Sequence, residues 1–402
     1  MATLVWLTHS FRTDSRLTSK LSGPCTFVYY SPYYFAGNRE KQILKQCSKA
    51  NLEAFYQSLD IMRKSLKAMG HEFYIFKQTN PIEHINTLID KHGFDRVVID
   101  LPLFGMWKTT DPMDIKVPFE LIDSDLVDDT CFNMTAKSRW MSHTRKISEF
   151  KPNQWNSGIV PNPINEASQS YPQYTKNNLI MPHIITTRAA GIAPTYIDTR
   201  DKHTGQTRLS TAFQNGTIDP SNTFYDIANT FQKSGADFTI NEGAHAAMLR
   251  QFAFREITIV QARRANLTME NTPMEWAEIV MHHKALDNLK NATPNPNSNV
   301  NLETIRNGNT GVIELDKILK HFNKGGIMPN RARMYFAGKV FYESKTGPEA
   351  LNTLIDTFDL IGLDGQCPNN YLQCIASMGL SYGKVMMFSN TRTFDLLNYD
   401  NK

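Results

Sequence analysis

The sequence predicts two kinds of domain in one chain: an N-terminal α/β domain with a Rossmann-like parallel sheet, and then an all-helical domain. Strand-like and helix-like segments alternate along the first part of the chain, which is typical of a parallel sheet with crossover helices. Further on, β-branched runs give way to amphipathic windows. A chain of 402 residues also exceeds one ordinary hydrophobic core. We therefore predict an α/β domain at 1–130, a connecting segment at 131–200 and a helical domain at 201–402.

The α/β domain is predicted from short runs of β-branched and aromatic residues, which lie at 3–7, 25–30, 72–76 and 96–101. The clearest helix precedes the third run and ends at Gly70. Its apolar residues step by three or four positions along one face: Leu52, Phe55, Leu59, Met62, Leu66 and Met69. The segment PIEHINTLIDKHG predicts a second crossover helix. No GxGxxG follows the first run, so this domain need not hold NAD.

The connecting segment is rich in Pro, Asn and Ser, notably at 151–178, and predicts an irregular connection. The helical domain is predicted from amphipathic windows at 243–265, 272–289, 313–324, 329–345 and 347–359. The polar segment NATPNPNSNVN at 291–301 predicts a surface loop between two of them.

The composition limits the setting and the partners of the chain. A net charge of +4 permits a polyanionic partner but only weakly favours nucleic acid. Five cysteines without a CxxC pair argue against a disulfide framework and a zinc ribbon, and favour a reducing, cytoplasmic setting. No apolar run approaches the roughly 18 residues of a membrane span. No histidines show HExxH spacing. We predict no membrane association and no bound metal.

Four polar clusters lie in the predicted helical domain: TRLS at 207–210, RQFAFRE at 250–256, NRARM at 330–334 and LDGQCPNNY at 363–371. Their arginines lie in windows that otherwise look buried, and a buried guanidinium needs a carboxylate or phosphate partner. A flavin dinucleotide could supply that partner through its pyrophosphate. The alternative is that the arginines pair with carboxylates on the helices, namely Glu256, Asp316 and Asp364.

The order of these clusters resembles the FAD-binding domain of photolyases and cryptochromes, over roughly residues 200–390. The family's T-S-R-L-S run resembles the residues that would bind the FAD phosphates: Thr207, Arg208, Leu209 and Ser210. Its W-R-E helix resembles Phe254, Arg255 and Glu256, with Arg255 on the flavin side. Its G-x-T-G-x-x-x-x-D segment resembles residues 308–316, and its N-R-x-R-M run resembles residues 330–334.

Two further segments are similar to class II photolyases. DGQCPNNY at 364–371 is similar to their D-G-R-D-P-N-G-Y, and RMYFAGK at 333–339 to their R-M-Y-W-x-K-K. The resemblance implies an ion pair of Arg333 with Asp364 under the flavin, with Asp364 accepting from flavin N3–H and Asn369 facing N5. Gln251, Asn330 and Gly365 complete the implied FAD contacts.

The first domain resembles the same family more faintly. LVWLTHSFRTD at 4–14 resembles its V-W-F-R-x-D-L-R opening, and the long helix before EFYIF resembles bacterial iron–sulfur photolyases. No cysteine quartet lies near the C-terminus, so we predict no iron–sulfur cluster. A second, light-harvesting chromophore would suit the family, although no residue pattern identifies one.

The resemblance implies repair of pyrimidine dimers in UV-damaged DNA, in which excited, reduced FAD gives an electron to a flipped-out dimer. The residues implied in catalysis are Gln251, Asn330, Met334 and Asn369, and those implied in DNA binding are Phe254, Arg331, Met334 and Cys374. We expect a monomer. The alternatives are a (6-4) photolyase, a cryptochrome-like photoreceptor and an unrelated two-domain binding protein.

Several positions bear on which DNA lesion the protein would repair and how well it would bind that lesion. The resemblance places a histidine of (6-4) photolyases at Asn330, which favours cyclobutane dimers, whereas Gln251 replaces the glutamate of cyclobutane-dimer photolyases. Phe254 and Cys374 stand where tryptophans are common in the family, which weakens the platforms for a flipped base.

The family's usual tryptophan chain, which carries electrons to the flavin, has no counterpart here. All five tryptophans precede residue 277. Four tyrosines are candidates for another relay: Tyr335, Tyr342, Tyr371 and Tyr382. We therefore expect flavin photoreduction to be slow or differently routed.

Overall fold

The computed structural model describes residues 1–103, 111–127, 151–172, 182–199, 206–232 and 244–378. The chain divides into two compact units. Unit 1 comprises residues 1–42, 53–194 and 208–268, and unit 2 comprises residues 43–52, 195–207 and 269–402. Each unit is described by itself. The domain boundaries near 130 and 200 stay a prediction.

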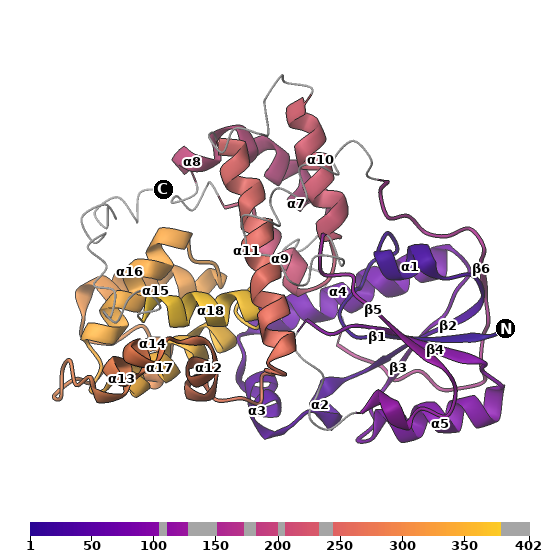
Figure 1. The fold of residues 1–402 in the computed structure, drawn as a ribbon, viewed down its shortest axis with the longest axis horizontal. Coiled ribbons are helices and arrows are strands. Elements are labelled where there is room, and N and C mark those ends of the chain that lie inside the picture. Colours follow the sequence, from indigo (N-terminus) through magenta and orange to yellow (C-terminus); the bar gives the residue numbers. More distant parts are fainter. Residues whose placement is uncertain (104–110, 128–150, 173–181, 200–205, 233–243, 379–402) are drawn as a thin grey trace. The chain divides into compact units, whose positions relative to one another are not determined.

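Unit 1 is built on a parallel sheet, which confirms the predicted α/β class (Figure 1). The strand order is β3-β2-β1-β4-β5, with β6 pairing with β2. The strands are β1 (Thr3–Leu7), β2 (Gly23–Tyr30), β3 (Phe73–Phe76), β4 (Arg96–Asp100), β5 (Phe119–Ile122) and β6 (Ile159–Pro161). Each pairing is parallel. The first four strands confirm the runs predicted from the sequence.

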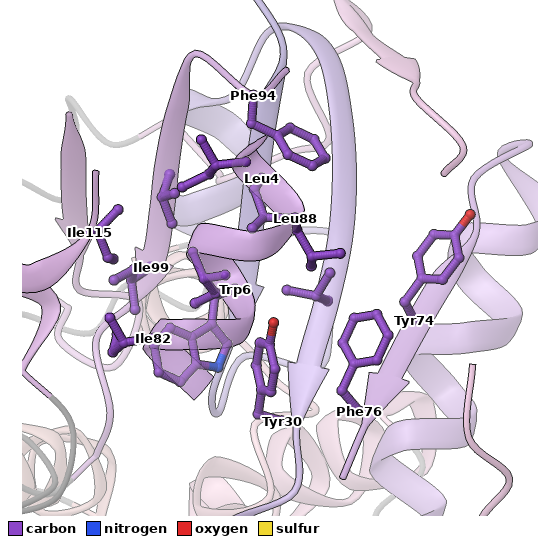
Figure 2. Packing of buried hydrophobic residues seen from close by; sticks show 14 of the residues in the cluster. Leu4, Trp6, Tyr30, Tyr74, Phe76, Ile82, Leu88, Phe94, Ile99 and Ile115 are labelled. Carbon is purple, nitrogen blue, oxygen red and sulfur yellow. The ribbon is translucent and has the colours of Figure 1, made fainter. Parts of the chain in front are cut away.

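Helices cover both faces of this sheet because the side chains of a strand alternate between them. Leu4 and Trp6 pack with residues of α5 (Pro81–His92) on one face, as Figure 2 shows. Val5 and Leu7 pack with residues of α4 (Lys49–Ala68) on the other. Both crossover helices confirm the predicted periodicity. Asn80 caps the start of α5, and Gly93 ends it in the left-handed conformation.

The connecting segment is more regular than predicted. Residues 159–161 form β6, whose register places Ile159 opposite Gly23 of β2. The helix α7 (Pro182–Ile192) follows further along. A three-residue strand is too short to show alternation, so the sequence gives no signal for it. The prediction of an irregular connection was therefore wrong for these two elements.

The other helices of unit 1 lie between strands or follow the last strand. They are α1 (Arg16–Lys20), α2 (Pro32–Phe35), η1 (Pro112–Asp114), α9 (Leu209–Gln214), α10 (Pro220–Gln232) and α11 (Ala244–Arg264). Three elements lie across the sequence borders of the two units: α3 (Asn38–Gln46), the first turn of α4, and η3 (Ala193–Thr195). The predicted window at 243–265 is α11.

Unit 2 is helical in its described part. Its helices are α8 (Tyr196–Thr199), α12 (Pro273–Val280), α13 (His283–Asn291), α14 (Leu302–Arg306), α15 (Ile313–Gly325), α16 (Asn330–Tyr342), α17 (Gly347–Ile361) and α18 (Pro368–Ser377). The predicted window 272–289 is two helices, because Met281 and His282 adopt extended backbone and His282 caps α13. The other predicted windows are single helices.

The helix α17 is the centre of unit 2, since it packs against α12, α13, α14, α16 and α18. Its buried face runs along most of its length, including Leu351, Leu354, Ile355 and Phe358. The predicted loop at 291–301 is confirmed, and its last residue, Asn301, caps α14. In the described ranges, no helix has the length and hydropathy that crossing a membrane would require.

Candidate functional site

The carboxyl edge of the sheet in unit 1 is occupied by the chain's own charged residues. Asp100, at the end of β4, accepts hydrogen bonds from the backbone N–H groups of His9 (2.8 Å) and Ser10 (2.6 Å), which follow β1. The Ser10 hydroxyl donates to the same carboxylate. Burial, and then the charge of Asp125, raises the pKa of Asp100.

A doubly wound sheet commonly binds a nucleotide phosphate between the strands where the order reverses. Here the strand order reverses between β1 and β4, and the Asp100 carboxylate already accepts from the backbone N–H groups there. This agrees with the missing GxGxxG and gives no support for a dinucleotide at this edge.

Asp125 is the centre of a buried cluster of charges beside that edge. Its carboxylate lies 2.9 Å from Nδ1 of His9 and 3.3 Å from Nη2 of Arg263. Arg255 donates to its backbone carbonyl at 2.6 Å, with the guanidinium 3.7 Å from the carboxylate. Burial opposes ionisation, but His9 and the two arginines outweigh it and hold the pKa of Asp125 well below its usual range.

The same arginines anchor α11 to the sheet. Arg263 also pairs with Asp123 at 2.5 Å and donates to the carbonyl of Pro102 at 2.9 Å. The guanidinium of Arg255 lies over the Phe213 ring, with its central carbon 5.0 Å from the ring centroid. Arg255, implied as a flavin-side residue, therefore already pairs with Asp125 in unit 1. Sequence reasoning missed Asp125, because it lies 130 positions from Arg255.

Two other residues implied at the lesion lie on the same helix. Gln251 is partly buried, and Phe254 is 53% exposed although it is a large apolar side chain. Residues three positions apart are neighbours on a helix surface, so both side chains are available to one ligand. Glu256, predicted as an alternative partner for arginine, instead accepts a hydrogen bond from the backbone N–H of Val127.

In unit 1, Arg208 has the features of an anion-binding residue. It is half-buried, it has a left-handed backbone (φ 62°), and no acceptor for its guanidinium is recorded among the described residues. Burial, and then the charge of Arg188, lowers the pKa of Arg208. Two cations close together are stabilised by an anion between them. Leu209 is buried and Ser210 is exposed, and Thr207 is partly buried.

Arg188 is a residue that sequence reasoning missed. It lies on α7, twenty positions before Arg208, and no motif includes it. Only the structure brings its charge near that of Arg208.

The second cluster lies in unit 2, where the predicted ion pair of Arg333 with Asp364 is present. The Nη2 atom of Arg333, on α16, lies 2.5 Å and 2.7 Å from the two carboxylate oxygens. Its Nε donates to the carbonyl of Met328, and its Nη1 donates to Oδ1 of Asn370 at 3.3 Å. The guanidinium carbon lies 5.2 Å from the ring centroid of Phe358. The alternative prediction, that the arginines pair with carboxylates on the helices, therefore holds for Arg333. The family resemblance implies the same ion pair.

Asn370 is a third residue that sequence reasoning missed. It is 1% exposed, and its Nδ2 donor has no partner among the described residues. A buried amide donor without an acceptor is costly, so it fits a place where a ligand oxygen or nitrogen is bound. Its neighbour Asn369, the implied N5 contact, is partly buried. The sequence signal was the doubled asparagine, which gave no reason to choose the second.

A close backbone contact explains why residue 365 is glycine. A Cβ atom added there would lie 1.8 Å from the carbonyl oxygen of Phe358, so the turn before α18 (Pro368–Ser377) requires glycine. The turn thereby places Asp364 beside Arg333. A role of Gly365 in cofactor binding stays a prediction.

The remaining residues that the resemblance implies at the site have fewer described contacts. Met334 is partly buried on α16, and Cys374 is 3% exposed on α18, where burial raises the pKa of its thiol. The side chains of Asn330 and Arg331 lie outside the described part of the chain, as does Tyr382. Within the described ranges, no group of three or more His, Cys, Asp and Glu is arranged to hold a metal ion.

No family model matches the chain, and no curated protein matches it in sequence. Solved structures do match. A cryptochrome of Synechocystis has a TM-score of 0.72 and 14% identity, covering 100% of this chain and 86% of that chain. A bacterial class III photolyase from Agrobacterium tumefaciens has a TM-score of 0.66 and 13% identity, covering 99% and 86%.

An archaeal photolyase from Sulfolobus tokodaii has a TM-score of 0.60 and 13% identity, covering 95% of this chain and 84% of that chain. Its structure is described with two FAD molecules and an implied light-harvesting cofactor. At such identities the likeness concerns the fold. The chain therefore has the fold of the photolyase/cryptochrome superfamily.

Proposed function

We propose that this chain is a flavoprotein that binds FAD and repairs pyrimidine dimers in DNA by light-driven electron transfer, with cyclobutane dimers as the preferred lesion. The observation that carries the proposal is the group of Arg333, Asp364 and Asn370 in a chain of this fold. It joins an ion pair to a buried amide donor that has no partner in the described part of the chain, and the family resemblance implies that this ion pair lies at the flavin ring.

The residues present fit FAD. In unit 1, Arg208 would bind phosphate, with the backbone of Leu209 and the hydroxyl of Ser210 beside it. By resemblance, Thr207, the residue before Arg208, would also bind phosphate. In unit 2, Asp364 would accept a hydrogen bond from the flavin ring, held in orientation by the two contacts from Arg333. When bound, FAD would supply the light-absorbing electron donor.

Five further residues would hold the flavin in this proposal. Asn369 would offer an amide near the flavin ring, and Asn370 would share this task because its buried Nδ2 donor has no partner among the described residues. The resemblance also implies contacts from Gln251 and Arg255, which lie on α11. Asn330 would contribute from the start of α16.

The lesion would be held by residues of several helices. Phe254 offers an exposed ring on which a flipped base can stack, and Gln251, three positions before it, can hydrogen-bond a pyrimidine edge. By resemblance, Met334 would contact the lesion from α16, and Arg331 would bind a DNA phosphate. Cys374, which is 3% exposed, is assigned to DNA binding by resemblance alone.

Replacing Phe254 with alanine should weaken binding of dimer-containing DNA by about 1–3 kcal/mol, because one stacking platform is lost. The free energy of unfolding should change by less than about 0.5 kcal/mol, since the ring is 53% exposed. Phe254→Trp should strengthen binding. Fluorescence anisotropy with a labelled oligonucleotide measures both.

The matched control is Ile279→Ala on α12, where an apolar side chain is equally exposed (53%). Its DNA affinity should equal that of the unaltered protein. An equal loss of affinity in both variants would mean that Phe254 is not a base platform.

The repair activity is tested by illuminating the protein with dimer-containing oligothymidylate under blue light and following the recovery of thymine absorbance. Recovery that needs both light and protein supports cyclobutane-dimer repair despite Gln251. Bound flavin without recovery of absorbance refutes cyclobutane-dimer repair and favours (6-4) repair or photoreception. The Synechocystis cryptochrome among the similar structures also suggests photoreception.

The proposal also includes a second chromophore and a monomeric state. A second chromophore would suit a fold that an archaeal photolyase with two FAD molecules shares. We also propose that the protein acts as a monomer on UV-damaged DNA. Size-exclusion chromatography with light scattering, and the ratio of flavin to protein after denaturation, measure these two properties.

A further inference from the structure

A buried tyrosine in unit 2 has a carboxylate at its hydroxyl group. Tyr371, on α18, is 0% exposed, and its hydroxyl donates to Oδ2 of Asp359 at 2.5 Å. Asp359, on α17, is also 0% exposed, and its backbone carbonyl accepts from Gln366. Neither side chain reaches solvent, so the hydrogen bond is held in one place by the packing of two helices.

The ring of Tyr371 also contacts a tryptophan. Trp276 on α12 is fully buried, and its ring centroid lies 4.8 Å from that of Tyr371, with the planes inclined at 48°. Rings at this separation are in direct contact. Three groups that can lose an electron or take a proton are therefore joined inside one unit.

The chemistry of a phenol explains why this arrangement matters. A tyrosine loses one electron readily only when its proton can leave at the same time, because the cation radical of a phenol is a very strong acid. A carboxylate at hydrogen-bonding distance is a ready acceptor for that proton. Burial excludes water from the pair, so the proton goes to Asp359 rather than to solvent.

Among the described candidates, neither Tyr342 nor Tyr335 is fully buried. Tyr342 is 42% exposed, and Tyr335 is partly exposed, with a pKa raised by burial and then influenced by Lys339 and Glu314. Tyr382 lies outside the described residues. Tyr371 also lies two positions after Asn369 on α18, and so in the same helical turn as the implied flavin contacts.

We propose that Tyr371, Asp359 and Trp276 form an electron relay that replaces the missing tryptophan chain; this inference rests on the proposed binding of FAD. On illumination, Tyr371 or its contact neighbour Trp276 gives one electron to the oxidised flavin. The electron deficiency settles on Tyr371, whose O–H bond breaks as the proton passes to Oδ2 of Asp359. The products are a neutral tyrosyl radical, a protonated Asp359 and a flavin carrying one more electron.

The relay is reset by a reductant from solution. A small-molecule thiolate gives one electron to the tyrosyl radical and becomes a thiyl radical, two of which combine to a disulfide. Asp359 returns the proton to the phenol oxygen. Asp359 is thus a positioning and proton-accepting residue, while Tyr371 is the group that is oxidised.

The first test does not depend on flavin. A short ultraviolet flash photoionises tryptophans in the protein as purified, and transient absorption then follows tryptophanyl and tyrosyl radicals. We expect a tyrosyl radical to grow in as the tryptophanyl signal decays. This growth should be lost in Tyr371→Phe and in Trp276→Phe, and should be at least about tenfold slower in Asp359→Asn. The matched control, Tyr342→Phe, should behave like the unaltered protein.

The second test uses the flavin-loaded protein. Blue light with a thiol present should bleach oxidised flavin at least about tenfold more slowly in Tyr371→Phe than in the unaltered protein or Tyr342→Phe. Electron paramagnetic resonance of the unaltered protein should show a tyrosyl radical, and D₂O should slow its formation. These two measurements need no variant, so a variant that does not fold leaves the test intact.

The outcomes separate the relay from the proposed function. If flavin is bound and Tyr371→Phe forms the tyrosyl radical and bleaches at the unaltered rate, the relay is wrong while flavin binding stands. If no flavin binds, the proposed function fails, and the ultraviolet flash alone decides whether the three side chains exchange an electron. A tyrosyl yield in Asp359→Asn equal to that of the unaltered protein, with no effect of D₂O, also overturns the relay.

Discussion

Replacing Asp364 with asparagine should weaken FAD binding by at least about 100-fold and lower the free energy of unfolding of unit 2 by about 3–5 kcal/mol. The side chains of Arg333 and Asp364 are only 15% and 8% exposed, so the variant leaves a guanidinium nearly buried without its carboxylate. It also removes the acceptor proposed for the flavin ring. Urea unfolding and titration with FAD measure the two effects.

A second substitution separates stability from binding. In Asp364→Asn combined with Arg333→Met, neither charge is left alone, and much of the lost stability should return. FAD affinity should stay low, because the acceptor is still missing. Recovery of FAD binding in the double variant would contradict a direct role of Asp364 at the flavin.

Replacing Asp125 with asparagine should destabilise unit 1 by about 3–5 kcal/mol at neutral pH. The carboxylate faces His9, Arg255 and Arg263 in the interior, and its loss leaves positive charge uncompensated. Because Arg255 and Arg263 anchor α11, residues on that helix should also become more open to hydrogen exchange. Chemical unfolding and exchange mass spectrometry measure these effects.

The pH dependence of this effect has a definite sign. The pKa of Asp125 is lower in the folded chain than in the unfolded chain, so its contribution is complete above the unfolded value of about 3.9. It is lost as the pH falls below that value towards the folded pKa. The difference in stability between the unaltered protein and Asp125→Asn should therefore shrink as the pH falls below about 4.

The matched control is Asp60→Asn on α4. Its pKa is also lowered, but by lysine and arginine on the helix surface, with the side chain 22% exposed. That substitution should change the free energy of unfolding by less than about 1 kcal/mol. A difference for Asp125 that is equally small, or that grows on acidification, would show that the buried cluster does not act as described.

Local sequence patterns predicted those elements whose signal lies within one segment. The steps of three and four along α4 and the alternating runs of β1 and β4 place their apolar residues on the faces that the structure buries. β6 was missed because three residues show no period. The break between two helices in the window 272–289 was not predicted, because neither Met281 nor His282 is a strong helix breaker.

The site was predictable only where a family motif kept its spacing. Arg333 and Asp364 came from such a motif, and the structure pairs them at 2.5 Å. Asp125 and Arg188 belong to no motif, and Asp359 reaches Tyr371 from another helix. Contacts between distant segments depend on packing, which no local spacing encodes, and so the partners of Arg255, Arg208 and Tyr371 required the structure.

The central claim is that this chain binds FAD, and the absorption spectrum of the purified protein tests it most directly. The spectrum is recorded as isolated, and again after incubation with FAD and removal of the unbound cofactor. We predict a flavin spectrum with about one FAD per chain, lost in Asp364→Asn. A protein that is colourless as isolated and stays so after incubation would contradict the account.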